Sequence, residues 1–240
     1  GAAAFAAYRE AGGALPAYAA GHSLGEYTAH VAAGSLAVAD AVRLVRARGS
    51  YMQEAVPPGE GAMAAVMKLD PAAIRNACAQ VAGVVEVANL NAPGQTVISG
   101  QAEAVAAAGE RLKSEGARVV PLKVSAPFHC SLMRPAAERL GADLARVRFG
   151  RPAFGIVCNV TADVLQDSAD ASELLQRQVT SPVRWVESVE TLRALGARRF
   201  LEFGAGKVLT GLIQRIAEGA DARSVVDKAS LHAALEAAAW

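Results

Sequence analysis

The chain has few cysteines, no excess of either charge and no cysteine motif typical of a metal or redox site. Its three cysteines (Cys78, Cys130 and Cys158) are far apart and form no C-x-x-C pair, which excludes a disulfide framework and a zinc site of that kind. We therefore expect a reducing compartment. Lys and Arg number 24 and Asp and Glu number 23, so an extended basic surface for nucleic acid is not expected.

Long hydrophobic runs are also missing. No apolar stretch is long enough to cross a bilayer, and the first residues show no charged segment followed by an apolar one, as a secretory leader would. H-E-x-x-H and paired-histidine spacings are absent, so we expect neither a metal nor another cofactor. The composition is 52% hydrophobic, with much alanine, and 20% charged, which is typical of a globular protein. We expect a cytoplasmic monomer with no membrane or nucleic-acid partner.

The pattern of helices and strands predicts an α/β fold with an inserted unit. Strands alternate with helices over 1–58 and again over 127–240, which indicates one core with a parallel sheet covered on both faces. Between them, residues 59–126 follow the order βαββαβ of a ferredoxin-like small domain. Within the core, we expect one helix to begin with Asp40 as its N-cap and to run to about Ala55.

The segment Gly21-x-Ser23-x-Gly25 has the pattern of a nucleophile elbow. It follows a short apolar strand and precedes residues with helical spacing, which is the context that this motif requires. The flanking glycines let the chain turn sharply, so that the Ser23 side chain projects above the sheet. The backbone N–H of Leu24 lies at a helix N-terminus, where negative charge is favoured.

A nucleophilic serine needs a base, and the chain offers four histidines. His22 is adjacent to Ser23 and its side chain is expected to diverge from it. We expect His30 to face solvent from the following helix, and His232 lies in an alanine-rich tail. His129 follows the last strand of the inserted unit, at a strand end where sites of α/β sheets gather. His129 is thus either the base or a capped loop histidine.

Arg48 has an unusual place on its helix. At 100° per residue it falls on the apolar face, opposite the two other arginines of the helix. A buried guanidinium needs an anion, because leaving it unpaired costs several kcal/mol. The partner is either an internal carboxylate or a carboxylate of a substrate, held by two hydrogen bonds. The apolar face consists of Ala41, Leu44, Val45, Met52 and Ala55, and the opposite arginines are Arg43 and Arg46.

Several motifs together resemble the malonyl-CoA:acyl carrier protein transacylase family, in the correct order and over essentially the whole chain. They are Gly21-His22-Ser23-Leu24-Gly25-Glu26-Tyr27, Ala41-Val42-Arg43-Leu44-Val45 with Arg48-Gly49 and Met52-Gln53-Glu54, Asn89-Leu90-Asn91-Ala92-Pro93-Gly94-Gln95, Pro127-Phe128-His129, Ser181-Pro182-Val183-Arg184-Trp185 and Gly204-Ala205-Gly206-Lys207-Val208-Leu209.

The resemblance implies an α/β-hydrolase-like core with a ferredoxin-like small domain, and transfer of a malonyl group from malonyl-CoA to acyl carrier protein in fatty acid or polyketide synthesis. It also implies roles for particular residues. Phe128 before the histidine resembles the form that prefers malonyl over methylmalonyl groups. The implied roles are Ser23 as nucleophile, His129 as its base, the Gln178 backbone carbonyl as the group that orients the histidine, the Leu24 N–H as an oxyanion donor, Arg48 as the anchor of the malonyl carboxylate, and Met52, Phe128, His22 and Asn91 as further substrate-binding residues.

One part of the family pattern has no counterpart here. The family opens with a strand and a Gly-Gln-Gly-Ser-Gln-type loop whose glutamine supplies a second oxyanion donor, and nothing in these residues matches it. We expect a fragment or a truncated form, in which sheet edges are left unpaired and activity is lower by ~10²–10³. Two alternatives to malonyl transfer are an acyl hydrolase acting on the carrier protein and an inactive docking module for it.

Overall fold

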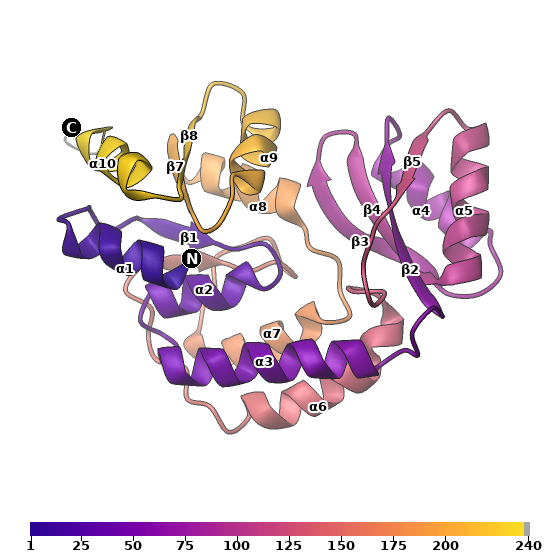
Figure 1. Ribbon diagram of the computed structural model, residues 1–240, viewed down its shortest axis with the longest axis horizontal. Helices are drawn as coiled ribbons and strands as arrows, with labels where there is room; N and C mark the ends of the chain where they lie inside the picture. Colours follow the sequence, from indigo (N-terminus) through magenta and orange to yellow (C-terminus); the bar gives the residue numbers. More distant parts are fainter. Residues whose placement is uncertain (238–240) are drawn as a thin grey trace.

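The computed structural model describes residues 1–237 and confirms the predicted fold class, an α/β-hydrolase-like core with a ferredoxin-like small domain (Figure 1). Strands β2 to β5 form one end of the molecule with α4 and α5, and the remaining elements form the core. The elements of the core are α1 (Ala2–Glu10), β1 (Tyr18–Ala20), α2 (Gly25–Ala32), α3 (Val38–Glu54), η1 (Ser131–Met133), α6 (Arg134–Leu144), β6 (Gly155–Val157), η2 (Ser168–Asp170), α7 (Ala171–Gln178), α8 (Trp185–Ala194), β7 (Arg199–Phe203), α9 (Val208–Ile216), β8 (Asp221–Val225) and α10 (Lys228–Ala237).

The small sheet is antiparallel, with strand order β3-β4-β2-β5. Side chains of β2 alternate between its faces, as the two-residue period of a strand requires. Ala64 and Val66 pack under the two helices, whereas Met63 packs on the other face with Phe128. This second face turns toward the core. The elements are β2 (Gly61–Met67), α4 (Pro71–Ala79), β3 (Val85–Ala92), β4 (Gln95–Gln101), α5 (Ala102–Ser114) and β5 (Arg118–Pro121).

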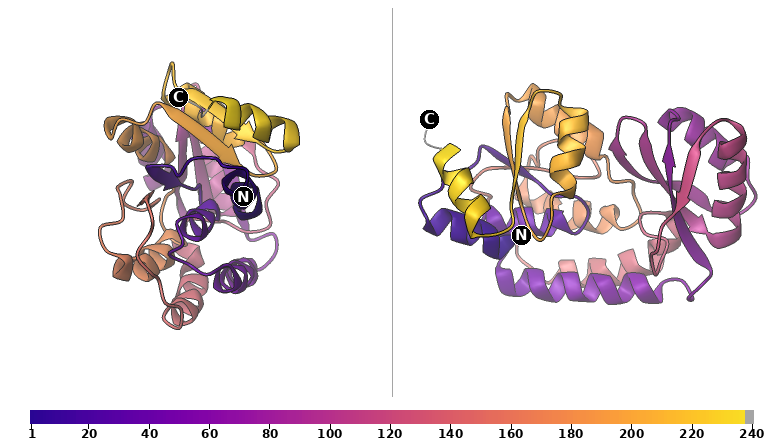
Figure 2. Two further views of the ribbon diagram at one scale, coloured as in Figure 1. Left: turned by 90° about the vertical axis from the view of Figure 1, so that its left-hand side faces the viewer. Right: turned by 45° about the horizontal axis from the view of Figure 1, so that its top comes forward.

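The strands of the core form two parallel pairs, β1 with β6 and β7 with β8. Figure 2 shows β7 and β8 side by side between α9 and α10. No described strand lies between β1 and β7, and a cavity of about 810 Å³ separates them, lined largely by apolar side chains such as Phe5 and Trp185. The parallel pairs bring the carboxyl ends of β1 and β6 to one edge, where α/β folds place their sites.

Helices α3, α6 and α7 form a layer beside this edge (Figure 1). The helix α3 begins at Val38, so the prediction of an N-cap at Asp40 was wrong: Asp40 lies in the first turn and forms an ion pair with Arg43. Its inward face is as predicted, because Leu44, Arg48 and Met52 are all buried. The charged side chain is therefore held inside the molecule by the apolar residues around it.

Three elements had no signal in the sequence, namely α1, β8 and α10. Helices α1 and α10 are rich in alanine, which gives little contrast between an inner and an outer face. The boundaries of the small domain at residues 59 and 126 stay a prediction. Within residues 1–237, no helix has the length and apolar character needed to span a bilayer.

Candidate active site

Ser23 lies at a sharp turn between β1 and α2 in a left-handed conformation, with φ of 53°. Non-glycine residues rarely adopt this conformation, and a nucleophile elbow holds its serine in it. An added Cβ at Gly21 would lie 2.0 Å from the carbonyl carbon of Gly25, so Gly21 must be glycine for the turn to close. Gly25 has open space around it, so the prediction that both glycines serve the turn holds only for Gly21.

Asn159 holds the elbow from the neighbouring strand. Its Oδ1 accepts a hydrogen bond from the Ser23 N–H at 2.6 Å, and its Nδ2 donates to the Gly21 carbonyl at 2.7 Å. Asn159 follows β6, which pairs with β1, so both turns lie at the same edge of the sheet. This side chain is fully buried and fixes the backbone on both sides of His22. The direction of the Ser23 side chain is thereby set.

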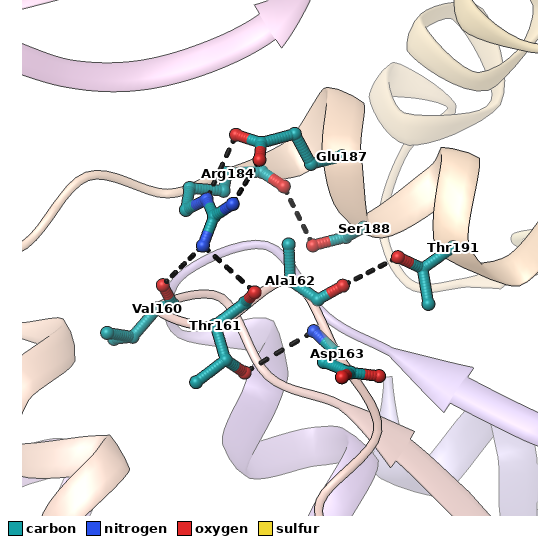
Figure 3. A network of polar contacts seen from close by, with 8 residues as sticks. All are labelled: Val160, Thr161, Ala162, Asp163, Arg184, Glu187, Ser188 and Thr191. Atoms are coloured by element: carbon teal, nitrogen blue, oxygen red, sulfur yellow. Dashed lines mark hydrogen bonds and ion pairs between the residues drawn. The ribbon is translucent and has the colours of Figure 1, made fainter.

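The loop that carries Asn159 is itself clamped by Arg184 (Figure 3). The guanidinium donates to the carbonyls of Val160 and Thr161 at 3.2 and 2.9 Å, and its other nitrogens pair with Glu187. The Arg184 backbone N–H also donates to the Asn159 carbonyl at 3.2 Å. The start of α8 thus supports the loop that in turn supports the nucleophile.

His129 contacts the nucleophile, as the family resemblance implies. Its Nε2 lies 2.7 Å from Ser23 Oγ, and its Nδ1 lies 2.9 Å from the Gln178 carbonyl. Burial first, and then the charge of Arg48, lower the His129 pKa to about 3, so the ring is neutral. A carbonyl can only accept a hydrogen bond, so Nδ1 carries the proton and the Nε2 lone pair faces the hydroxyl of Ser23.

The guanidinium of Arg48 completes this group of side chains. Its Nη2 donates to Ser23 Oγ at 2.9 Å and to Gln178 Oε1 at 3.1 Å, whereas the buried Nε has no partner in the described structure. No carboxylate of the described residues lies within 4.0 Å of it. Of the two partners that the sequence left open, an internal ion pair is therefore not formed. An unpaired donor beside the nucleophile is suited to an anionic ligand.

Glu26 is the buried carboxylate of the site. It is 1% exposed and accepts hydrogen bonds from Gln178 Nε2 at 2.7 Å and from the Asn159 backbone N–H at 3.0 Å. Burial is the largest influence on its pKa and raises it to about 7, against these hydrogen bonds and the charge of Arg48. Glu26 therefore connects the backbone of Asn159, whose side chain orients the elbow, with the Gln178 side chain, which accepts from the guanidinium.

The other predicted site residues differ in how deeply they are buried. His22 Nε2 donates to Asn91 Oδ1 at 2.8 Å, so its side chain is held by β3. Leu24 is half exposed and is the residue directly before α2. Met52 is 2% exposed inside the helical core, and Phe128 is half-buried between the small sheet and α3.

His30 does not face solvent, so that prediction was wrong. It is completely buried, its Nδ1 lies 2.9 Å from Ser35 Oγ, and its ring packs edge-on against Phe149. The inward face of α2 also holds Tyr27, and His30 lies one turn further along the same face. Burial lowers the His30 pKa to about 4. His232 lies exposed on α10, away from Ser23.

Two residues of the site were not predicted as functional, Glu26 and Asn159. The sequence carries a signal for each. Asn159 is a polar residue directly after the apolar run Ile156-Val157-Cys158, at the carboxyl end of a strand. Glu26 precedes Tyr27 in the first turn of a helix whose inner face begins there. Within residues 1–237 no cluster of His, Cys, Asp and Glu could hold a metal ion.

This arrangement can carry out nucleophilic acyl transfer. A serine hydroxyl donates to a neutral imidazole, whose second nitrogen is fixed by a backbone carbonyl. The Leu24 N–H lies at the N-terminus of α2, where negative charge is favoured. A cation lies beside the serine oxygen, where a negatively charged group would be favoured.

Comparison with known sequences agrees with this chemistry. The profile of the Acyl transferase domain family matches residues 2–231. The malonyl CoA-acyl carrier protein transacylase of Salmonella typhimurium is 48% identical over 231 residues, which cover 95% of this chain and 75% of that relative. The protein of the same name from Bacillus subtilis is 46% identical over 228 residues, with coverage of 93% and 72%.

Solved structures give the same result. One is a malonyl-transacylase in complex with the holo acyl-carrier protein of a type II PKS, with a TM-score of 0.96 and 47% identity, covering 98% of this chain and 77% of that one. Another is the malonyl CoA-acyl carrier protein transacylase of Coxiella burnetii, with a TM-score of 0.95 and 41% identity, covering 98% and 75%. With a family profile that spans nearly the whole chain and relatives at this identity, the chain belongs to the acyl transferase domain family.

Proposed function

We propose that the chain transfers a malonyl group from malonyl-CoA to the phosphopantetheine thiol of an acyl carrier protein, through an ester on Ser23. The observation that carries this proposal is the meeting of His129 and Arg48 on one serine oxygen, at 2.7 and 2.9 Å. One group activates the nucleophile and the other recognises an anionic acyl chain. The names of the relatives support the same donor and acceptor.

In the first half of the reaction Ser23 is acylated. His129 Nε2 takes the proton from Oγ as the oxygen attacks the thioester carbonyl, and the Leu24 N–H stabilises the oxyanion. When the tetrahedral intermediate collapses, the thiolate of CoA leaves and takes the proton from His129. The Gln178 carbonyl accepts from Nδ1 throughout and stabilises the imidazolium.

Arg48 binds the free carboxylate of the acyl group. In a malonyl ester this carboxylate is separated from the ester oxygen by only a carbonyl and a methylene, so the guanidinium beside Oγ is within reach. The carboxylate also offsets the positive charge that lowers the pKa of His129. Binding the correct acyl group thus makes the imidazole a stronger base. An uncharged acyl group gives no such gain.

In the second half of the reaction the phosphopantetheine thiol of the carrier protein accepts the malonyl group from Ser23. His129 takes the thiol proton, sulfur attacks the ester carbonyl, and Ser23 leaves with the proton returned to its oxygen. We assign further substrate contacts to Phe128, His22 and Asn91, with Phe128 favouring malonyl over methylmalonyl groups. Met52 contributes from the core by supporting the helix that carries Arg48; a direct contact with substrate stays a prediction.

Three broader expectations remain predictions. They are a cytoplasmic location, a monomeric state, and a role in fatty acid or polyketide synthesis. Free, buried cysteines support the first of these. A relative bound to a type II PKS carrier protein supports the polyketide context for that relative.

A transfer assay tests the proposal. The protein is incubated with malonyl-CoA and either holo or apo acyl carrier protein, and both malonyl-carrier protein and free malonate are measured. We expect malonyl on the holo carrier protein alone, no transfer by Ser23→Ala, and little by His129→Ala. Release of free malonate in place of malonyl-carrier protein would mean a hydrolase, and no turnover at all would mean a docking module.

A further inference from the structure

The carboxylate of Glu26 lies inside the protein without a cation to pair with. Its oxygen accepts from two neutral donors, Gln178 Nε2 and the Asn159 N–H. Among residues 1–237 no Lys, Arg or His nitrogen lies within 4.0 Å of it. A buried carboxylate of this kind is costly when ionised and inexpensive when protonated. Its charge state therefore responds to changes in the charge around it.

A single amide connects Glu26 to the guanidinium of Arg48. Gln178 donates through Nε2 to Glu26 at 2.7 Å and accepts through Oε1 from Arg48 Nη2 at 3.1 Å. The anion and the cation of the site thus face each other across one side chain. Of the other two Arg48 nitrogens, Nε is buried without a partner in the described structure. Glu26 therefore balances the positive charge of Arg48 through Gln178 and without direct contact, and the guanidinium still has an unpaired N–H for a ligand.

Other titratable groups face Glu26 from three elements. Tyr27 lies on the same helix, Arg48 on α3, and Cys158 after β6. Burial raises the pKa of the tyrosine and of the cysteine above the ordinary values, so both stay neutral between pH 6 and 9 by a wide margin. Arg48 stays charged. Glu26, whose pKa is raised to about 7, is the group of this set that changes charge in that range.

We propose that Glu26 sets the charge of the acyl pocket: its carboxylate balances Arg48 in the empty site and takes up a proton when the carboxylate of an acyl group binds Arg48. This inference rests on the proposed function, because it assumes that Arg48 is the carboxylate anchor. The proton comes from solvent on binding and returns to solvent when the acyl group leaves. Glu26 touches no reacting atom and is a specificity-determining residue that acts through Gln178.

The charge balance makes the preference for malonyl groups depend on pH. Two carboxylates compete for one guanidinium, so substrate binding favours the protonated form of Glu26 and raises its pKa further. Above the free-site pKa of about 7, each malonyl group must bring in a proton, and its binding weakens as pH rises. An acetyl group has no carboxylate and needs no proton. His129, whose pKa is lowered to about 3, stays neutral throughout this range and adds no pH dependence to the comparison.

The first test compares the loading of Ser23 by malonyl-CoA and by acetyl-CoA from pH 6 to pH 9. The ratio of the two kcat/KM values is expected to be level up to pH 7 and then to fall, by up to about tenfold per pH unit. In Glu26→Gln, which keeps an oxygen acceptor, the ratio is expected to stay level. Glu173→Gln, an exposed residue of α7, is the matched control and should follow the unchanged protein. A ratio that does not change with pH in the unchanged protein would overturn the proposal.

The second test does not depend on folding of the Glu26 variant. Binding of malonyl-CoA to Ser23→Ala is measured by calorimetry at pH 8 in buffers of different ionisation enthalpy, with acetyl-CoA as the reference for the CoA portion. We expect uptake of a large fraction of one proton for malonyl-CoA beyond that for acetyl-CoA. Equal proton uptake for both ligands would refute the role of Glu26, while malonyl loading of Ser23 that requires Arg48 would still support the proposed function.

Discussion

Replacing Arg48 with alanine removes the cation of the acyl pocket and tests what the guanidinium binds. The side chain is 7% exposed, touches Ser23 Oγ and Gln178 Oε1, and has no carboxylate within 4.0 Å among the described residues. In the proposed function it gives two charge-assisted hydrogen bonds to a malonyl carboxylate. Each is worth roughly 1.5–3 kcal/mol, so about 3 kcal/mol or more is lost.

That loss corresponds to at least a hundredfold in rate, since each ~1.4 kcal/mol is a factor of ten. The contact with Ser23 is common to every acyl group, so the ratio of malonyl-CoA to acetyl-CoA loading isolates the carboxylate. We expect Arg48→Ala to lower this ratio more than hundredfold. Arg43→Ala, on the exposed face of the same helix, is the control and should leave the ratio unchanged.

Both loading rates are measured by quenched reaction of the purified variants, beside a thermal melt of each. A parallel loss on both substrates with a lowered melting temperature would refute the reasoning, because it would mean that Arg48 supports the fold and does not bind the substrate.

Three further perturbations follow from the geometry. Gly21→Ala should abolish folding or activity, because its Cβ would lie 2.0 Å from a backbone carbon, whereas Gly25→Ala should be tolerated within about 1 kcal/mol; expression and melting temperature decide, and equal effects would contradict the account. Asn159→Ala should lower kcat at least tenfold with a smaller change in KM, since the elbow loses two hydrogen bonds, and an unchanged kcat would count against its role. His30 has a folded pKa of about 4 against 6.5 when unfolded, so the stability that its neutral form provides is present above pH 6.5 and is lost as pH falls. In denaturant titrations at pH 7 and pH 5, the free energy of unfolding should fall by about 2 kcal/mol more in the unchanged protein than in His30→Leu. An equal fall in both proteins would contradict the assignment.

Local sequence patterns predicted those parts of the site whose geometry is set within a single helix or a single turn. The elbow is a short motif with its strand and helix around it, and Arg48 stands out because one face of α3 is otherwise apolar. The contact between Ser23 and His129 joins the core to the loop after the small sheet. The sequence alone left that pairing open, and the family resemblance favoured it.

The rest of the site depends on contacts between distant segments, which no local pattern encodes. Asn159 and Glu26 meet because β6 pairs with β1, and a shift of one residue in the register of this pair would separate them. His30 was expected in solvent because, in a short helix that contains alanine, the sequence does not distinguish the inner face from the outer one. Its burial follows from Phe149, more than a hundred residues away, which covers that side of α2.

The central claim is that Ser23 carries the malonyl group, and peptide mass spectrometry tests it most directly. The protein is mixed with malonyl-CoA, quenched in acid and digested, and the peptide that contains Ser23 is examined. We predict a malonyl mass on Ser23, its disappearance when holo acyl carrier protein is added before the quench, and no adduct on Ser23→Ala. An unmodified Ser23 peptide during turnover, or an adduct that persists in Ser23→Ala, would contradict it.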